Sequence, residues 1–150
     1  MITLVLLTLL AADPALQPLA FLEGTWDART QAGTANAAST GAYTFVKELG
    51  GHILARHSSA GDHNDLLYVY ADAPGQPLKA IYFDNEGHVI HYSVTSTPSS
   101  VVFLSDASAP GPQFRLVYAR KADSLSGKFQ MRAPGKAEWT SYLEWTGSKK

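Results

Sequence analysis

The residues with the widest range of chemistry in this sequence are its histidines, because an imidazole can act as a general base near neutral pH or bind a metal ion. Two of them, His57 and His91, lie among apolar neighbours in stretches that read as strands. An inward-facing imidazole beside Tyr70, Tyr82 or Arg56 could hydrogen-bond a ligand carboxylate or carbonyl, or accept a proton from a substrate. The alternative is a histidine held by ordinary contacts in the core or on the surface.

The spacing of the histidines argues against a metal centre. A zinc site needs several ligands that converge to about 2 Å from one ion. His52 and His57 are an odd number of residues apart, as are His88 and His91, so each pair falls on opposite faces of a regular strand. The chain has no cysteine to supply a thiolate. We therefore expect no metal site.

A second group of candidate residues is aromatic. The chain contains seven tyrosines, six phenylalanines and three tryptophans, and cavities lined by aromatic side chains with a few polar groups are typical small-molecule sites. The alternative places the tyrosines outside a sheet, as half-buried cross-strand pairs. Our candidates for the lining of a lumen are His57, Tyr70, Tyr82, His91, Tyr92 and Tyr118.

Other function classes lack the residues they need. No Gly-x-Ser-x-Gly elbow marks a nucleophilic serine, and Gly50-Gly51 reads as a hairpin turn rather than a phosphate loop. Twelve Lys and Arg against thirteen Asp and Glu give a net charge of -1, without the basic surplus that nucleic-acid binding requires. We expect a small apolar molecule as partner, no nucleic acid, no membrane span, and a monomer or homodimer.

The elements that must position these residues are strands. Turn signals recur every ten to thirteen residues or so, which is the spacing of an antiparallel meander, and the runs between them alternate in polarity. Such a sheet, with no long helix to cover it, favours closure into an all-β, up-and-down barrel of about ten strands. A short helix is predicted over Pro14 to Leu22, with Asp13 as its N-cap, and a long loop over Thr30 to Thr40. The predicted strands are Gly24 to Arg29, Gly41 to Glu48, His52 to Ser59, Asp65 to Ala71, Leu78 to Asp84, His88 to Thr95, Val101 to Ser105, Phe114 to Arg120, Leu125 to Arg132 and Glu138 to Trp145.

The segment PLAFLEGTWDAR, residues 18 to 29, resembles the opening of barrels of the calycin superfamily, in particular the lipocalin-like and nitrobindin-like domains of uncharacterised bacterial proteins. The matching residues are Phe21, Leu22, Gly24 and Trp26. A weaker likeness lies in ELGGHIL, residues 48 to 54. The resemblance implies that Gly24 turns the chain into the sheet and that Trp26 plugs one end of the barrel. It also implies an arginine stacked on Trp26 from a late strand, for which Arg115, Arg120 and Arg132 are open alternatives.

Nitrobindins hold haem through a histidine near the carboxyl end of the barrel, and this chain departs from that pattern. No histidine follows His91. A haem iron would instead need His57, His91, or a tyrosine such as Tyr118 or Tyr142. We expect no cofactor, and haem is the alternative that the resemblance leaves open.

Residues 1 to 12 read as a signal peptide, which leaves 13 to 150 as one barrel domain. Ile2 to Leu10 have the length and polarity of a secretory h-region and precede small residues. The charged n-region is missing, since the first basic residue is Arg29. We expect a periplasmic or secreted protein. The alternative is a terminal strand or helix that docks on the barrel of a cytoplasmic protein.

These observations predict non-catalytic binding of a small, largely apolar ligand in the barrel lumen. The first alternative is a barrel enzyme of the cyclase or isomerase kind, with an inward histidine or tyrosine as the acid-base group. The second is a structural barrel that its own side chains fill and that holds no ligand.

Overall fold

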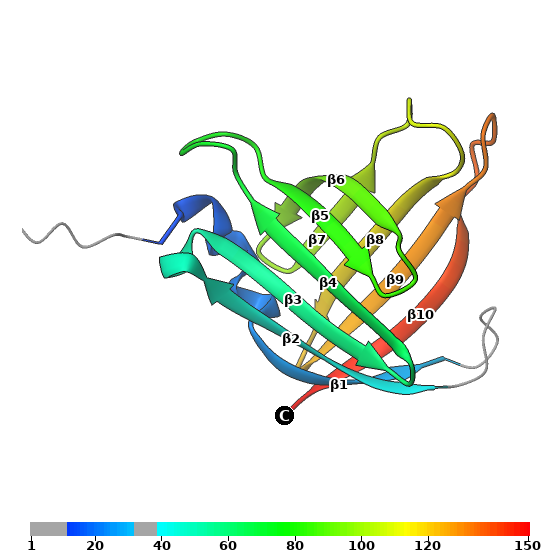
Figure 1. Cartoon of the computed structure of the whole chain (residues 1–150). Helices are drawn as coiled ribbons and strands as arrows, with labels where there is room; N and C mark the ends of the chain where they lie inside the picture. The colour runs from blue at the N-terminus through cyan, green and yellow to red at the C-terminus, as the bar shows by residue number, and fades with distance from the viewer. Residues whose placement is uncertain (1–11, 32–38) are drawn as a thin grey trace, which may run out of the picture.

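A computed structural model describes residues 12–31 and 39–150. Its strands form one closed antiparallel barrel in which each strand pairs with its neighbours in sequence and β1 pairs with β10, which confirms the predicted up-and-down barrel (Figure 1). The strands are β1 Gly24–Thr30, β2 Thr40–Glu48, β3 Ile53–Ala60, β4 His63–Tyr70, β5 Lys79–Asp84, β6 Val89–Thr97, β7 Ser100–Ser105, β8 Gln113–Lys121, β9 Ser124–Arg132 and β10 Thr140–Lys149.

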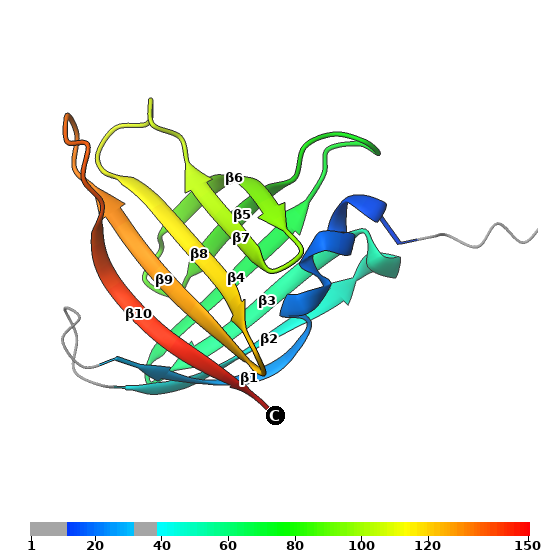
Figure 2. The ribbon, with the colours of Figure 1, turned by 180° about the vertical axis from the view of Figure 1, so that it is seen from behind.

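Two short 3₁₀ helices complete the fold, η1 at Pro14–Leu22 and η2 at Leu49–Gly51. η1 has the predicted bounds and start: Pro14 opens it, and the Asp13 carboxylate accepts a hydrogen bond of 2.9 Å from the Ala15 N–H. Figure 2 shows η1 across one end of the barrel, which we call the closed end. No helix in the ranges that the structure describes is long and apolar enough to cross a membrane.

The last strand extends further than its sequence predicts. β10 continues to Lys149, four residues beyond the predicted end at Trp145, because its final residues pair with β1 and complete the barrel. Most of the predicted loop and of the predicted signal peptide fall on residues 32–38 and 1–11, which lie outside the described residues.

Alternation along the strands decides what the barrel contains. On β3, Leu54 and Arg56 face the lumen, and on β4 so do Asp65, Leu67 and Val69. At the closed end the lumen is filled by three leucines of η1 and by aromatic rings packed around Tyr118. The neighbours of Tyr118 are Phe45, Tyr43, Phe103 and Trp145, with ring centroids 5.4 to 6.5 Å away.

The opposite end of the barrel, which we call the mouth, is formed by the β3–β4 and β5–β6 turns and by the loops that join β7 to β8 and β9 to β10 (Figure 1). Because η1 and the aromatic cluster occupy the closed end, a molecule that enters the lumen must pass the side chains of the mouth. The functional question is therefore which lumen-facing groups remain available there.

Candidate functional site

The structure separates the six predicted lumen residues into two groups. Tyr82, Tyr92 and Tyr118 face the lumen, and Tyr118 is completely buried. The side chains of His57, Tyr70 and His91 point away from it, to the outer face. The cause is strand parity: each of these three lies next in sequence to a residue whose side chain faces the lumen, such as Arg56 beside His57.

The surroundings of His57 fit this outer position. Its side chain is 47% exposed, and its Nε2 lies 2.9 Å from Oε1 of Glu48 on the neighbouring strand. Its ring also meets the Tyr68 ring edge-on, with centroids 6.5 Å apart. His57 therefore contributes to cross-strand contacts on the outside of the sheet, where it cannot reach a ligand in the lumen.

Trp26 sits at the closed end, where its indole N–H donates a 2.8 Å hydrogen bond to the Leu22 carbonyl. Gly24 has φ +123°, a conformation that favours glycine, as the chain enters β1. The cation over the Trp26 ring is Lys149, with Nζ 5.4 Å from the ring centroid. Arg115 instead lies over Trp139, 4.3 Å from its centroid, and Arg120 borders a small hollow beside Trp26.

The most unusual feature of the lumen is a buried ion pair. The Arg56 guanidinium on β3 pairs with the Asp65 carboxylate on β4, and the two side chains are only 6% and 8% exposed. The same guanidinium donates a 2.5 Å hydrogen bond from Nη1 to Oη of Tyr118, which reaches it from β8. Burial alone would lower the pKa of Arg56, but Tyr118 and Asp65 raise it, so the guanidinium stays charged.

The Arg56–Asp65 pair is not among the predicted site residues, although the sequence pattern could have indicated it. Arg56 shares a strand face with Leu54, and Asp65 shares one with Leu67 and Val69. Opposite charges on the apolar faces of two consecutive predicted strands are rare unless the charges pair. Tyr43 and Trp145, which flank the pair's partner Tyr118, were missed as well because an aromatic residue in a strand is ordinary core.

The lumen tyrosines are poor acid-base groups. Burial raises the pKa of Tyr82, Tyr92 and Tyr118 above the usual range, so all three hydroxyls keep their protons at neutral pH. A general acid or base needs a pKa close to the working pH. The inward tyrosines therefore suit hydrogen bonding to a ligand better than proton transfer.

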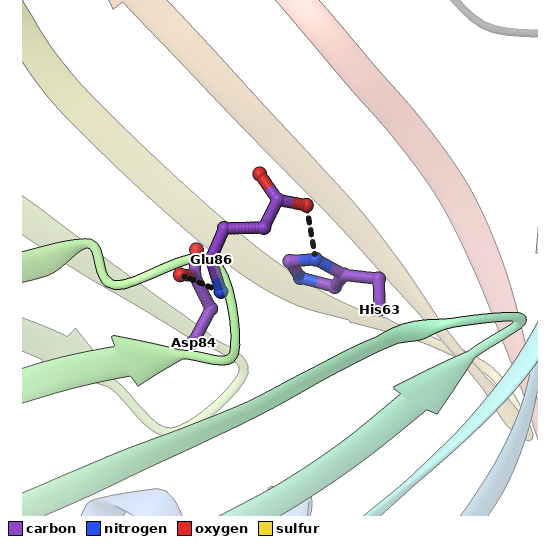
Figure 3. Close-up of side chains that lie close together, drawn as sticks. All are labelled: His63, Asp84 and Glu86. Carbon is purple, nitrogen blue, oxygen red and sulfur yellow. Dashed lines mark hydrogen bonds and ion pairs between the residues drawn. The ribbon is translucent and has the colours of Figure 1, made fainter.

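A polar network surrounds the mouth where the β3–β4 and β5–β6 turns meet. His63 opens β4, and its Nδ1 lies 3.2 Å from Oε1 of Glu86 (Figure 3). The Nε2 of the same ring lies 3.3 Å from Oη of Tyr82. The other imidazole contact of His63 is to Asp65, with Nε2 3.4 Å from Oδ2. The mouth network thus connects through Asp65 to the buried Arg56.

Ligand atoms of His63, Asp84 and Glu86 lie within 4.8 Å of one another, the spacing of a group that could hold a metal ion. The Asp84 carboxylate, however, already accepts hydrogen bonds from the backbone N–H groups of Glu86 and His88, at 3.0 and 2.9 Å. It also accepts one from the Tyr82 hydroxyl and pairs with the His88 ring. These contacts hold the β5–β6 turn in place, which accounts for the cluster without an ion.

The Asp84–His88 contact predicts a pH dependence of stability. Burial would raise the pKa of Asp84, but hydrogen bonds from His88 and Tyr82 hold it below its usual range, and Asp84 raises the pKa of His88. The contribution is complete between about pH 4 and about pH 6.5, the ordinary values of the two groups. It is lost on acidification through the lowered pKa of Asp84 and on alkalinisation through the raised pKa of His88.

We therefore expect His88→Gln to lower the melting temperature most at about pH 5 and much less at about pH 8. Thermal unfolding followed by circular dichroism across this range measures the difference. His91→Gln, on the outer face of β6, is the matched control for loss of an imidazole. A deficit of equal size at both pH values would show that charge on His88 does not stabilise the turn.

Apolar side chains inside the mouth are only partly covered. They face the lumen and pack on the core, yet they remain partly exposed, unlike the three leucines of η1 and the rings packed around Tyr118 at the closed end. The partly exposed apolar residues of the mouth are Ala28, Tyr82, Ile90, Phe114, Phe129 and Leu143.

A separate hollow of about 630 Å³ lies across β2 to β5. Most of its lining residues have outward parity, including Thr44, His57, Leu66 and Phe83, which are direct cross-strand partners. The hollow therefore lies mainly on the outer face of the barrel, although Tyr43, Ser58 and Asp65, whose side chains face the lumen, also border it.

No family model matches the chain, and no curated protein matches it. The closed barrel of ten antiparallel strands is compatible with a calycin-like fold. The residues considered for haem do not form a site in the lumen, because His57 and His91 face outward and the Tyr118 hydroxyl is bound to Arg56. Tyr142, the remaining candidate, is 46% exposed.

Proposed function

We propose that this protein is a calycin-like barrel that binds a small, largely apolar molecule in its lumen and does not transform it. The observation that carries the proposal is the set of apolar side chains in the mouth that face inward and yet stay in partial contact with water. A ligand that covers them removes apolar area from water, which contributes about 25 cal/mol for each Å². The neutral lumen tyrosines support binding over catalysis.

The experiment that tests this proposal compares two neighbouring residues of one strand. Ser58 faces the lumen opposite Tyr43 in the register, whereas Ser59 is exposed on the outer face. We expect Ser58→Phe to fill the mouth and to weaken binding of the uncharged fluorophore N-phenylnaphthylamine at least about tenfold, a loss of about 1.4 kcal/mol. Ser59→Phe adds the same ring on the outer face and should leave the affinity unchanged.

The two variants also separate the competing interpretations. Loss of binding in Ser59→Phe alone would move the site to the outer hollow, which Ser59 borders. A wild-type protein that does not enhance the fluorescence of the probe would favour a structural barrel without a ligand. Circular dichroism of both variants checks that the barrel still forms.

We further propose that residues 1 to 12 are a leader that directs the protein to the periplasm or the cell exterior. Support comes from Asp13, whose N–H donates to the Gly51 carbonyl at 3.1 Å and whose side chain caps η1. A mature protein that starts near Asp13 would therefore keep these contacts.

A further inference from the structure

Three buried polar atoms in the described lumen have no hydrogen-bond partner. They are Oη of Tyr43, Nε of Arg56 and Nε1 of Trp145. Their side chains are all at least nine-tenths buried, and each belongs to a residue that touches Tyr118. Burial of a donor or acceptor without a hydrogen-bond partner is costly, so three such atoms around one ring indicate a position that can hold another group.

The chemistry of the three atoms defines what that group must offer. The N–H groups of Arg56 and Trp145 can only donate. Burial raises the pKa of the Tyr43 phenol, and the nearby Trp145 N–H lowers it only in part, so the Tyr43 hydroxyl keeps its proton and can donate as well. The indole and the phenol do not meet hydrogen-bond geometry with each other. What is missing is an acceptor, such as an oxygen with free lone pairs.

The charge of the site decides which kind of acceptor fits. The positive charge of Arg56 is already balanced by Asp65, which is buried beside it. An ionised carboxylate would add an unpaired negative charge to a buried site, which is costly. A carbonyl oxygen accepts the same hydrogen bonds without a net charge.

We infer that the lumen ligand is a neutral, largely apolar molecule that carries a carbonyl oxygen, as in a ketone, aldehyde, ester or amide, and that this oxygen binds at Tyr43, Arg56 and Trp145. The inference rests on the proposed binding function and names its ligand class.

The test uses three molecules that differ only at the polar end: methyl heptyl ketone, octanoic acid and nonane, each displacing N-phenylnaphthylamine at neutral pH. We expect the ketone to displace the probe at a concentration at least about tenfold below that of either octanoate or nonane. Equal or tighter binding of octanoate would overturn the inference while leaving lumen binding intact. If the wild-type protein does not bind N-phenylnaphthylamine at all, the proposed function is overturned, and the inference with it.

Two variants locate the oxygen. Trp145→Phe removes one donor and keeps an aromatic ring, so it should weaken ketone binding about two- to tenfold and leave nonane unchanged. Asp65→Asn removes the charge that balances Arg56 and should raise the affinity for octanoate relative to the ketone at least about tenfold. If Trp145→Phe changes ketone and nonane binding equally, the oxygen does not bind at this position. That result overturns the inference even if Asp65→Asn fails to fold.

Discussion

Replacement of Arg56 by methionine is expected to lower the free energy of unfolding by about 3–5 kcal/mol. The guanidinium and the Asp65 carboxylate are both buried, and removal of one leaves the other as an uncompensated charge in the lumen. Tyr118 loses the donor to its hydroxyl at the same time. Urea denaturation followed by tryptophan fluorescence measures the loss against the wild-type protein.

The double variant Arg56→Met/Asp65→Asn distinguishes the effect of an uncompensated buried charge from the effect of lost packing. It removes both charges at nearly constant volume, and we expect it to regain more than half of the stability that Arg56→Met loses. Lys47→Met, which removes the partly exposed ion pair with Glu23, should change the unfolding midpoint little. A double variant as unstable as Arg56→Met would mean that the methylenes and hydrogen bonds of Arg56, rather than its charge, hold the lumen together.

The barrel is predictable from this sequence because turn residues separate its strands at nearly even intervals. Each strand is too short to form a stable structure without its neighbours. Short alternating runs such as residues 128 to 132 have one apolar side, and ten such runs without covering helices must close to bury it. The position of η1 was equally predictable, since Asp13 as N-cap and Pro14 at the first helical position are a standard helix start. Local signals of this kind survive in the fold because tertiary contacts agree with them.

The face of each strand was harder to predict. His57 and Arg56 differ by one position, and a shift of one residue exchanges the lumen for the outer face. The apolar neighbours of His57 favoured an inward ring, but Leu54 is the residue that sets the parity, and it brings Arg56 inside. The Arg56 side chain therefore lies inside the barrel in place of the His57 ring, and its charge is balanced there by Asp65 on the next strand.

Contacts between distant segments could not be predicted. Lys149 lies over Trp26 because the barrel closes between its first and last strands, and nothing in either segment reports that register. His63 meets Glu86 because the β3–β4 and β5–β6 hairpins, with one hairpin between them, have their turns at the same end of the barrel. Sequence spacing shows which face a residue occupies within one strand, whereas these pairs depend on how strands are staggered around the barrel.

The second large effect is expected at Gly127, where the structure leaves no room for a methyl group between β9 and the Trp145 indole. A Cβ on Gly127 would lie 2.1 Å from Cε2 and 2.2 Å from Cζ2 of Trp145, far inside van der Waals contact. The indole is buried against Tyr118 and has little freedom to move away. Overpacking of this kind costs about 1–3 kcal/mol, so we expect Gly127→Ala to lower the free energy of unfolding by that amount.

Gly147 provides the matched comparison, because a Cβ there meets mainly the hydroxyl end of the Tyr43 side chain, at 2.1 Å. A terminal hydroxyl can shift more easily than a fused ring, so Gly147→Ala should cost clearly less than Gly127→Ala in the same urea titration. The double variant Gly127→Ala/Trp145→Leu frees the space and should recover part of the loss. If Gly127→Ala is as stable as the wild type, Trp145 does not pack over β9. The proposed position of a ligand oxygen beside the Trp145 indole would then be overturned as well.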